Sequence, residues 1–403
     1  MKETSFLAKL LDGERVEWKS LGEVCEVLRG SRLTKKELSD EYQYPVFHGG
    51  LIPLGYYNQY NRNANQTMII NTGSIGEVVW SSVDFWSSDG TFVVKTPDEI
   101  DDRFLYFFLK INETYFKSQK REGGVPTINR EAIANLQIPI PCPENPKKSL
   151  EIQAEIVRIL DNFTTLTAEL TAELTARKKQ YNFYRDQLLT FAEGEVEWKP
   201  LGDVCELSNT GVDKKINDNE QTITLLNYVD VFRNNYIDNS IPKMQVTASD
   251  KKIKDCTALY GDIFITPSSE KIDEIGIASV IMEDLTNTCY SYHIMRLRLK
   301  EKNFITSCFI RYCFESDVLR SQILKNATGL TRFGLTKGRF ESLQIPLPPI
   351  DVQREIVRIL DNFDALTNSI TEGLPREIEL RTKQYEYYRD LLLNFPKNEG
   401  VVE

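Results

Sequence analysis

Residues 156–163 read Ile-Val-Arg-Ile-Leu-Asp-Asn-Phe, and the same eight residues return unchanged at 356–363. Three further stretches return in the same order along the chain. Residues 16–26 (VEWKSLGEVCE) return as 196–206 (VEWKPLGDVCE), residues 136–141 (LQIPIP) as 343–348 (LQIPLP), and the stretch 179–191 from 383 to 395. Self-similarity at such intervals is the signature of a duplicated structural unit. The chain therefore contains two copies of one frame.

The two copies share this frame while their interiors differ. Residues 28–135 and 208–342 have almost no sequence in common, and they differ in length. A duplication kept only for stability gives little reason for the interiors alone to diverge. Two recognition modules carried on one scaffold explain the pattern better.

The ends of the two frames are predicted to be long helices. From Ile152 and again from Val352, apolar residues recur at steps of three and four, which is the spacing of a coiled-coil seam. The first helix carries Thr-Ala-Glu-Leu twice in succession, at 167–174. The second carries Gly373 and Pro375 instead, and proline removes a helix donor, so we expect a break or kink near 372–375.

The interiors are predicted to mix strands with one helical region each. Short apolar runs bounded by Gly, Asn, Asp and Ser are expected as strands at 67–70, 77–80, 91–94, 262–266, 277–281 and 294–299. Helices are expected near 102–117 and 305–324. The predicted order is a mixed domain at 1–148, a long helix at 149–191, a second mixed domain at 192–348 and a second helix at 349–403.

Composition excludes several classes of protein. The chain has 49 Lys and Arg against 59 Asp and Glu, a net charge of −10, so charge alone does not suggest DNA binding. It lacks an apolar run long enough to span a bilayer, and its seven cysteines form no CxxC pair, which favours free thiols in the cytoplasm. With two histidines, a His-rich metal site is not expected.

In these repeated stretches the sequence resembles the DNA specificity subunit of type I restriction–modification systems, over the whole chain. The Thr-Ala-Glu-Leu repeat resembles the subfamily called IC. The resemblance implies an α+β fold with two mixed α/β target-recognition domains in a pseudo-twofold arrangement, separated by two long antiparallel coiled-coil helices. Each domain is then expected to read one half of a bipartite, asymmetric site in double-stranded DNA. The helices are expected to set the spacer between the halves and to dock two methyltransferase subunits.

The same resemblance implies no catalytic residue, no metal and no cofactor on this chain. S-adenosylmethionine is expected on the methyltransferase partner, and ATP and magnesium on the motor–nuclease subunits of the restriction complex. The residues agree, because the sequence lacks a phosphate-binding GxxxxGK[ST] loop, an [ND]PP[YF] adenine-methylation motif, GxSxG and HExxH. Two alternatives stay open: a free-standing enzyme acting on nucleic acid, and a coiled-coil adaptor with protein-binding domains.

Candidate DNA-contacting side chains form one polar cluster in each interior. Asn and Gln can pair with adenine and Arg with guanine in the major groove, while Tyr and Ser can donate to phosphates. The candidates in the first interior are Tyr56, Tyr57, Asn58, Gln59, Asn61, Arg62 and Asn63. Those in the second are Asn227, Tyr228, Arg233, Asn234, Lys251, Lys252 and Ser268. The alternative interpretation of both clusters is a solvated polar loop.

A basic stretch precedes the Pro-containing end of each interior. Residues 117–130 contain four basic residues and one acid, and residues 325–339 contain four basic residues and no acid. Their glycines permit close approach of the backbone to phosphate. The candidate phosphate contacts are Lys117, Lys120, Arg121, Arg130, Lys325, Arg332, Lys337 and Arg339. The alternative interpretation is a solubilising surface.

Aromatic residues near the ends of the predicted helices are candidates for docking a partner protein. They are Tyr181, Phe183, Tyr184, Tyr385, Tyr387 and Tyr388. Packing of the two helices on each other is expected to use most of the remaining apolar stripe.

Overall fold

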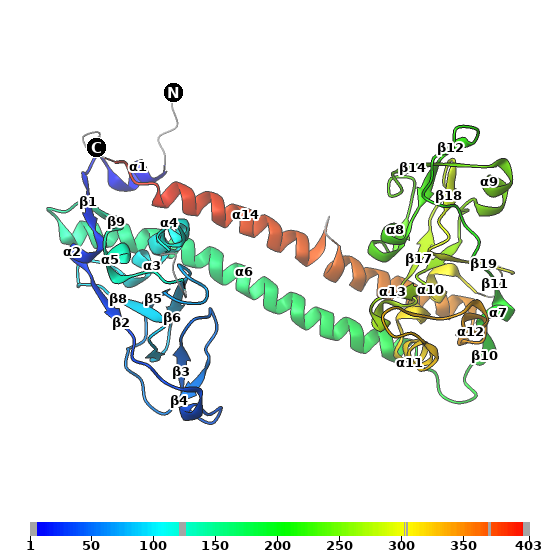
Figure 1. The fold of residues 1–403 in the computed structure, drawn as a ribbon, viewed down its shortest axis with the longest axis horizontal. Coiled ribbons are helices and arrows are strands. Elements are labelled where there is room, and N and C mark those ends of the chain that lie inside the picture. The colour runs from blue at the N-terminus through cyan, green and yellow to red at the C-terminus, as the bar shows by residue number, and fades with distance from the viewer. Residues whose placement is uncertain (1–5, 121–125, 302, 304, 370–371, 398–403) are drawn as a thin grey trace. The chain divides into compact units, whose positions relative to one another are not determined.

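The structure is a computed structural model that describes residues 6–120, 126–301, 303, 305–369 and 372–397. It divides into two compact units, each with one recognition domain, the first three repeated stretches of one frame and the last repeated stretch of the other (Figure 1). Unit 1 comprises residues 1–170 and 377–403, and unit 2 comprises residues 171–376. The predicted α+β class is confirmed, since each unit contains both sheets and helices.

The repeated frame sequences form the same two-stranded ribbon in each unit. In unit 1, β1 (Val16–Ser20) pairs antiparallel with β9 (Gln137–Pro141), and in unit 2, β10 (Glu197–Pro200) pairs with β21 (Gln344–Leu347). The tryptophan of each first strand lies opposite a proline of the second. Proline is tolerated here because a two-stranded ribbon has free edges. The ribbon thus brings both ends of each interior together.

Long helices leave each ribbon and pair within their units. Helix α6 (Pro146–Leu188) has 43 residues, and the second frame has α13 (Ile350–Asn368) and α14 (Gly373–Leu393). In unit 1, Phe163 of α6 stacks on Tyr388 of α14 with ring centroids 5.3 Å apart. In unit 2, Phe363 of α13 stacks on Tyr184 of α6 at 5.8 Å. The phenylalanine of each repeated octapeptide therefore meets a tyrosine of the other frame.

The predicted break near 372–375 in the second long helix is confirmed, and it lies between the end of α13 at Asn368 and the start of α14 at Gly373. Helix α13 ends at Asn368, because Ser369 has the extended values φ −65° and ψ 129°. Helix α14 then begins at Gly373, which has φ 75°. Pro375 consequently lies in the first turn of α14, where no N–H donor is needed. Residues 370–371 lie outside the described residues.

In unit 1 the recognition domain has a four-stranded sheet in the order β2-β8-β5-β6 and a three-stranded sheet in the order β4-β3-β7. The strands are β2 (Glu26–Arg29), β8 (Thr91–Lys95), β5 (Gln66–Ile70), β6 (Val78–Ser81), β4 (Gly55–Tyr57), β3 (Tyr44–Phe47) and β7 (Trp86–Ser87). Figure 1 shows β3 and β4 at the end of the domain away from α6. The predicted strands at 67–70, 77–80 and 91–94 are confirmed as β5, β6 and β8.

In unit 2 the corresponding sheets have the orders β11-β19-β15-β17-β13 and β14-β12-β18. The strands are β11 (Cys205–Ser208), β19 (Met295–Leu299), β15 (Ile263–Ile265), β17 (Ala278–Ile281), β13 (Tyr236–Ile237), β14 (Met244–Ala248), β12 (Gln221–Leu226) and β18 (Thr288–Tyr290). A further short pair joins β16 (Ser268–Ser269) to β20 (Phe333–Gly334). The three strands predicted in this interior are confirmed as β15, β17 and β19.

The helical regions predicted at 102–117 and 305–324 are each two helices. They are α3 (Asp102–Ile111) with α4 (Glu113–Ser118), and α10 (Ser307–Glu315) with α11 (Asp317–Asn326). Asp101 and Thr306 cap α3 and α10 by accepting backbone N–H bonds. The remaining elements are α1 (Phe6–Leu11), α2 (Leu21–Val24), η1 (Lys35–Glu37), α5 (Arg130–Ala134), α7 (Leu201–Val204), α8 (Tyr228–Arg233), α9 (Asp250–Cys256), η2 (Ile272–Glu274) and α12 (Lys337–Glu341).

Truncation of Leu360 tests the packing of the second frame. Its side chain is 0% exposed in the core that joins α13 to the unit 2 ribbon. We expect Leu360→Ala to lower the free energy of unfolding of unit 2 by about 2–5 kcal/mol, the cost of a buried cavity. Hydrogen exchange of the β15 amides in urea measures this change. The control Leu330→Ala, at a site 96% exposed, is expected to have almost no effect. Equal effects of the two variants would contradict this packing.

Candidate nucleic-acid interface

The two recognition domains hold the same loops at one end of their sheets although their sequences differ. Two backbone hydrogen bonds of each domain occupy matching places. They are Ser88 N to Phe47 O (2.9 Å) and Gly76 N to Ile70 O (2.8 Å) in unit 1, and Ser291 N to Leu226 O (2.9 Å) and Gly276 N to Thr266 O (2.8 Å) in unit 2. Both glycines have a φ near 80°, a backbone conformation that glycine adopts without strain.

In unit 1 these loops surround a cleft of about 620 Å³, called cleft A. Its residues follow the ends of β2, β3, β5 and β7. The lining consists of Arg29, Arg32, Leu33, Thr34, Lys35, His48, Leu54, Thr72 and Asp89. Basic side chains dominate this lining.

The cations of cleft A are available to a ligand. Arg29, Arg32 and Lys35 are exposed, and none of them forms an ion pair among the residues that the structure describes. The imidazole Nδ1 of His48 lies 3.3 Å from a carboxylate oxygen of Asp89, so the one acid of the cleft already faces a basic partner. Unpaired guanidinium groups suit phosphate oxygens and the acceptor edge of guanine.

In unit 2 the matching loops surround a cleft of about 460 Å³, called cleft B. Its lining consists of Tyr228, Phe232, Ser269, Glu270, Lys271, Glu274, His293 and Arg332. The rings of Tyr228 and Phe232 are stacked with centroids 5.8 Å apart. Glu274 accepts hydrogen bonds from Ser269 Oγ at 2.6 Å and pairs with Lys271 Nζ at 3.2 Å, and these contacts lower its pKa. Cleft B thus combines an aromatic wall with fewer free charges than cleft A.

His293 also lines cleft B, and its pKa is shifted as well. Burial, followed by the nearby cations of Lys214 and Arg332, lowers the pKa of His293 below its ordinary value of 6.5. The neutral imidazole has one donor and one acceptor nitrogen, so at pH 7 it can take part in hydrogen bonds of either direction. Its ring packs on Tyr292 with centroids 4.0 Å apart.

Both basic stretches run past the clefts. Ile128 N donates to Asn71 O at 3.2 Å in unit 1, and Leu335 N donates to Pro267 O at 3.1 Å in unit 2, which are matching positions beyond β5 and β15. In unit 2, Arg332 lines cleft B and donates from Nε to Ser268 Oγ at 3.1 Å. The structure therefore brings two of the predicted contacts, Ser268 and Arg332, together beside cleft B.

The other residues of the basic stretches differ in their surroundings. Lys117 is paired with Glu77 at 2.5 Å and with Glu113 at 3.8 Å, which raises its pKa. Arg339 donates to the carbonyl of Asn326, and Lys337 lies 3.5 Å from Glu341. Three further predicted residues are exposed: Lys120, Arg130 and Lys325. Arg121 lies outside the described residues.

In the polar cluster predicted in the first interior, some side chains are exposed to solvent and others pack or form hydrogen bonds within the domain. Tyr56, Asn58, Gln59 and Asn63 are exposed, whereas Tyr57 packs on Trp86 at 5.2 Å. The Asn61 amide donates to Ser87 O at 3.0 Å and accepts from Ser87 N at 2.8 Å. Arg62 donates to the carbonyls of Asn61 and Arg29. The side chains of Asn61 and Arg62 thus hold this loop to β7 and β2, and their DNA contacts stay predictions.

Several residues of the cluster predicted in the second interior also have structural roles. Asn227 is 8% exposed and caps α8 by accepting from Val229 N at 2.8 Å, and its DNA contact stays a prediction. Asn234 donates to Asp230 O at 2.7 Å, and Lys252 donates to Gly211 O at 2.8 Å. Two of the other predicted residues, Arg233 and Lys251, are exposed.

The aromatic residues predicted to dock a partner also divide into two groups. Tyr181 is 6% exposed, and its hydroxyl donates to Glu315 at 2.8 Å, so its side chain belongs to the core of unit 2. Tyr385 is half-buried against the unit 1 core. Phe183 and Tyr387 are each 64% exposed, and the stacked residues Tyr184 and Tyr388 are each 38% exposed. These four remain accessible on the surfaces of their units.

The family model described as "Type I restriction modification DNA specificity domain" matches residues 14–177 and 193–380, one match for each copy. The chain belongs to this family. It is 38% identical to the EcoR124I/EcoR124II type I restriction enzyme specificity subunit of Escherichia coli, over 100% of both chains. It is 31% identical to a specificity subunit of a putative type I restriction enzyme of Haemophilus influenzae, over 97% of this chain and 98% of that one.

Solved structures support the same fold. The type I S subunit of M. genitalium has a TM-score of 0.63 at 16% identity, with 96% of this chain and 98% of that chain covered. A chain from a structure on complex assembly and conformational transition of the type I restriction–modification system has a TM-score of 0.59 at 16% identity, covering 94% and 97%. The sequence resemblance to type I specificity subunits is thus confirmed, and the chain's function is that of a sequence-specificity subunit.

Sequence reasoning about this specificity subunit missed most of cleft A. Arg29, Arg32, Lys35 and His48 were not among the candidates, and in cleft B neither was Lys271. One signal was available, since residues 29–36 hold four basic residues directly after a strand-like run. His48 carries no such signal, because its place beside the cleft depends on how β3 and β7 pair.

The described residues contain no group of three or more His, Cys, Asp and Glu side chains placed to hold a metal ion. All seven cysteines are free, and six of them are buried. Within the same residues, no helix combines the length and apolarity that crossing a membrane requires.

The protonation of His293 gives a direct test of the electrostatics of cleft B. We expect its NMR titration midpoint to lie below 6.5, and Arg332→Gln to raise it partway, because burial is the larger cause of the shift. The chain has two histidines, so His48→Gln leaves a single imidazole signal and provides the assignment. A midpoint at or above 6.5 in the unmodified cleft would show that this description of its charges is wrong.

Proposed function

We propose that clefts A and B read the two halves of a bipartite, asymmetric site in double-stranded DNA. One observation carries the proposal: the clefts occupy matching places in two domains of one fold, while their linings differ. Because the clefts lie at matching places, the two domains can approach the same kind of ligand in the same way. Because their linings differ, they can recognise two different half-site sequences.

Cleft A offers donors, and cleft B offers both donors and an apolar wall. Arg29 and Arg32 are suited to the two acceptors of guanine, and Lys35 to phosphate. In cleft B the neutral imidazole of His293 and the hydroxyl of Ser269 suit mixed donor and acceptor edges, and Phe232 suits a thymine methyl group. Exposed basic residues of the stretches 117–130 and 325–339 would hold the phosphates beside each half-site.

The long helices are proposed to act as an antiparallel coiled-coil spacer between the two domains. Within each unit, apolar residues at steps of three and four pack one helix on the other, and each octapeptide phenylalanine stacks on a tyrosine. A rigid spacer would fix the number of unread base pairs between the half-sites.

The exposed aromatic residues are proposed to dock two methyltransferase subunits, one on each unit. Phe183 of unit 2 and Tyr387 of unit 1 occupy matching positions in the duplicated sequence, which suits two copies of one partner. Motor–nuclease subunits would complete the restriction complex. S-adenosylmethionine would be bound by the methyltransferase, and ATP and magnesium by the motor–nuclease. The chain itself would have no active site and would work in the cytoplasm, where its buried thiols stay reduced.

Removal of a cation from cleft A tests its contact with DNA. We expect Lys35→Gln, measured with the methyltransferase partner bound, to weaken binding and to reduce the slope of log affinity against log salt by about one. The matched control is Lys36→Gln, since Lys36 is exposed next to Lys35 but does not line the cleft. An unchanged slope for Lys35→Gln, or equal changes in both variants, would exclude a phosphate contact at Lys35.

The length of α6 tests the spacer. One inserted Thr-Ala-Glu-Leu unit lengthens a helix by about 6 Å and turns it by about 400°, a residual of about 40°. A base pair of B-DNA turns about 35°, so each domain would keep nearly the same facing on the duplex. We expect one unit more or less to change the gap by about one base pair and to leave both half-sites unaltered. Methylome sequencing measures both, and an unchanged gap or altered half-sites would contradict the spacer.

A further inference from the structure

The first recognition-domain helix of each unit is attached to a long helix by a buried glutamine. Gln153 Oε1 of α6 accepts from the backbone N–H of Asp101 at 2.8 Å, and Gln353 Oε1 of α13 accepts from that of Thr306 at 3.0 Å. Both glutamines are 0% exposed. Asp101 and Thr306 are the N-cap residues of α3 and α10, so the two contacts are equivalent.

A second attachment lies eight residues farther along each long helix, at the aspartate of the repeated octapeptide. In unit 1, Arg103 donates to Asp161 Oδ1 from Nε at 2.9 Å and from Nη2 at 2.7 Å. The Arg103 guanidinium also lies over the rings of Trp80, Tyr106 and Phe107, at 4.7–4.9 Å from their centroids. This contact ties the recognition domain of unit 1 to α6.

In unit 2 the equivalent aspartate, Asp361, accepts from different donors. Tyr312 Oη donates to Asp361 Oδ1 at 2.6 Å, and the Tyr236 hydroxyl donates to the same oxygen. Burial and the bond to Asp361 raise the pKa of both phenols, which therefore remain protonated donors. One guanidinium in unit 1 and two phenols in unit 2 thus donate to equivalent carboxylates, although the two recognition domains differ in sequence.

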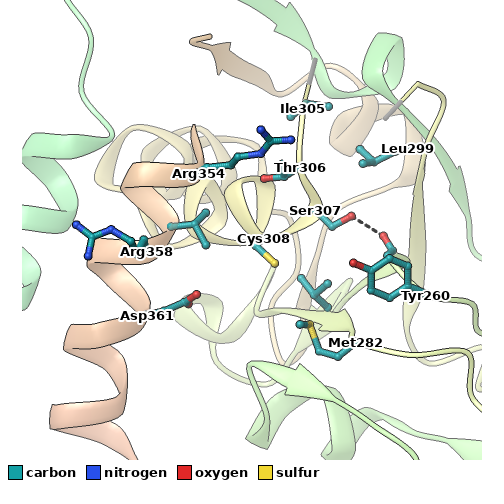
Figure 2. Close-up of a pocket in the computed structure, with 13 residues that line it drawn as sticks. Tyr260, Met282, Leu299, Ile305, Thr306, Ser307, Cys308, Arg354, Arg358 and Asp361 are labelled. Atoms are coloured by element: carbon teal, nitrogen blue, oxygen red, sulfur yellow. Dashed lines mark hydrogen bonds between the residues drawn. The ribbon is translucent and has the colours of Figure 1, made fainter. Parts of the chain in front are cut away.

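Each aspartate stands at an open cleft between its long helix and its recognition domain. Asp361 of α13 lines a cavity of about 480 Å³, and Figure 2 shows it on the helix at one side of the view, with Tyr260 at the opposite side and Cys308 between them. Asp161 lines a cavity of about 840 Å³ at the matching place in unit 1. Side chains do not fill this part of either interface. Leu160 and Leu360 join each long helix to the buried core of its unit, and at the open cleft the bonds to the aspartate restrain the angle between helix and domain.

We propose that Asp161 and Asp361 are positioning residues that fix the angle between each recognition domain and its long helix, and thereby the gap between the half-sites. This inference rests on the proposed function as a reader of bipartite DNA. The glutamine holds a point of attachment through the backbone, and the aspartate sets the orientation through donors that each domain supplies.

The test removes the donors to Asp361 without creating a cavity. The double variant Y236F/Y312F deletes both hydroxyls and keeps the rings on which the buried Arg311 packs, at 5.3 and 4.4 Å. Methylome sequencing first identifies the half-sites and gap of the wild-type complex with its methyltransferase. Anisotropy titrations then compare duplexes with the native gap and with gaps one base pair longer and shorter.

We expect the preference of Y236F/Y312F for the native gap to fall about tenfold, the size expected for loss of a hydrogen bond to a charged group. Discrimination within the half-site read by unit 1 should remain unchanged. The matched control is Tyr290→Phe, which removes a buried hydroxyl of the same domain that bonds to Ser208 at 3.2 Å and not to the helix. This control should keep the gap preference even if its unfolding temperature falls.

The gap preference separates positioning from stability. If Y236F/Y312F binds all three duplexes more weakly by the same factor, or binds them as the wild type does, the inference is wrong and the proposed function stands. A wild-type complex without any half-site preference would overturn the proposed function and this inference with it. Selective loss of gap preference in Y236F/Y312F, with Tyr290→Phe unaffected, is the supporting result.

Discussion

Each unit depends on burial of one face of the repeated octapeptide. Ile156 and Leu160 are buried in unit 1, as are Ile356 and Leu360 in unit 2, where they join the paired helices to the rest of the core. The aspartate follows the buried leucine directly and lies about 100° around the helix from it. Fixing the apolar face therefore fixes where the carboxylate points. Two domains with unrelated sequences are then built against the same helix surface.

The net charge of −10 and the basic lining of cleft A are compatible because the cations are local. Arg29, Arg32 and Lys35 are exposed and lie close together, whereas many other basic side chains are paired with carboxylates on the same surface, as Arg158 is with Glu155 at 2.6 Å. Pairing neutralises cations that would otherwise attract any polyanion. On the proposed function, long-range attraction to DNA would thereby be low, and contact would depend on close fit in the clefts.

Sequence periodicity and duplication predicted most of the fold. The strands β5, β8 and β19 and the long helix α6 follow from local patterns, because alternation and heptad spacing are local properties. The break in the second long helix also follows from the sequence, although its exact residues do not, since Pro375 is acceptable in a first turn and Ser369 ends α13.

The candidate site was less accessible to sequence reasoning. Asn227 looked like a base-reading amide but is a helix cap, and Tyr181 looked like an exposed aromatic but is core. His48 reaches cleft A only through the parallel pairing of β3 with β7, a contact between segments 40 residues apart in sequence. Polar composition marks a loop, whereas long-range pairing decides which of its side chains face outward.

The buried glutamines accept a backbone N–H, a group that every amino acid except proline provides. The frame is thus indifferent to the side chain at the start of the incoming helix. At this contact, a different recognition domain would need a non-proline residue with extended backbone, in addition to donors for the aspartate and apolar residues for the core. The glutamine of each frame can therefore hold recognition domains of different sequence through the same backbone contact.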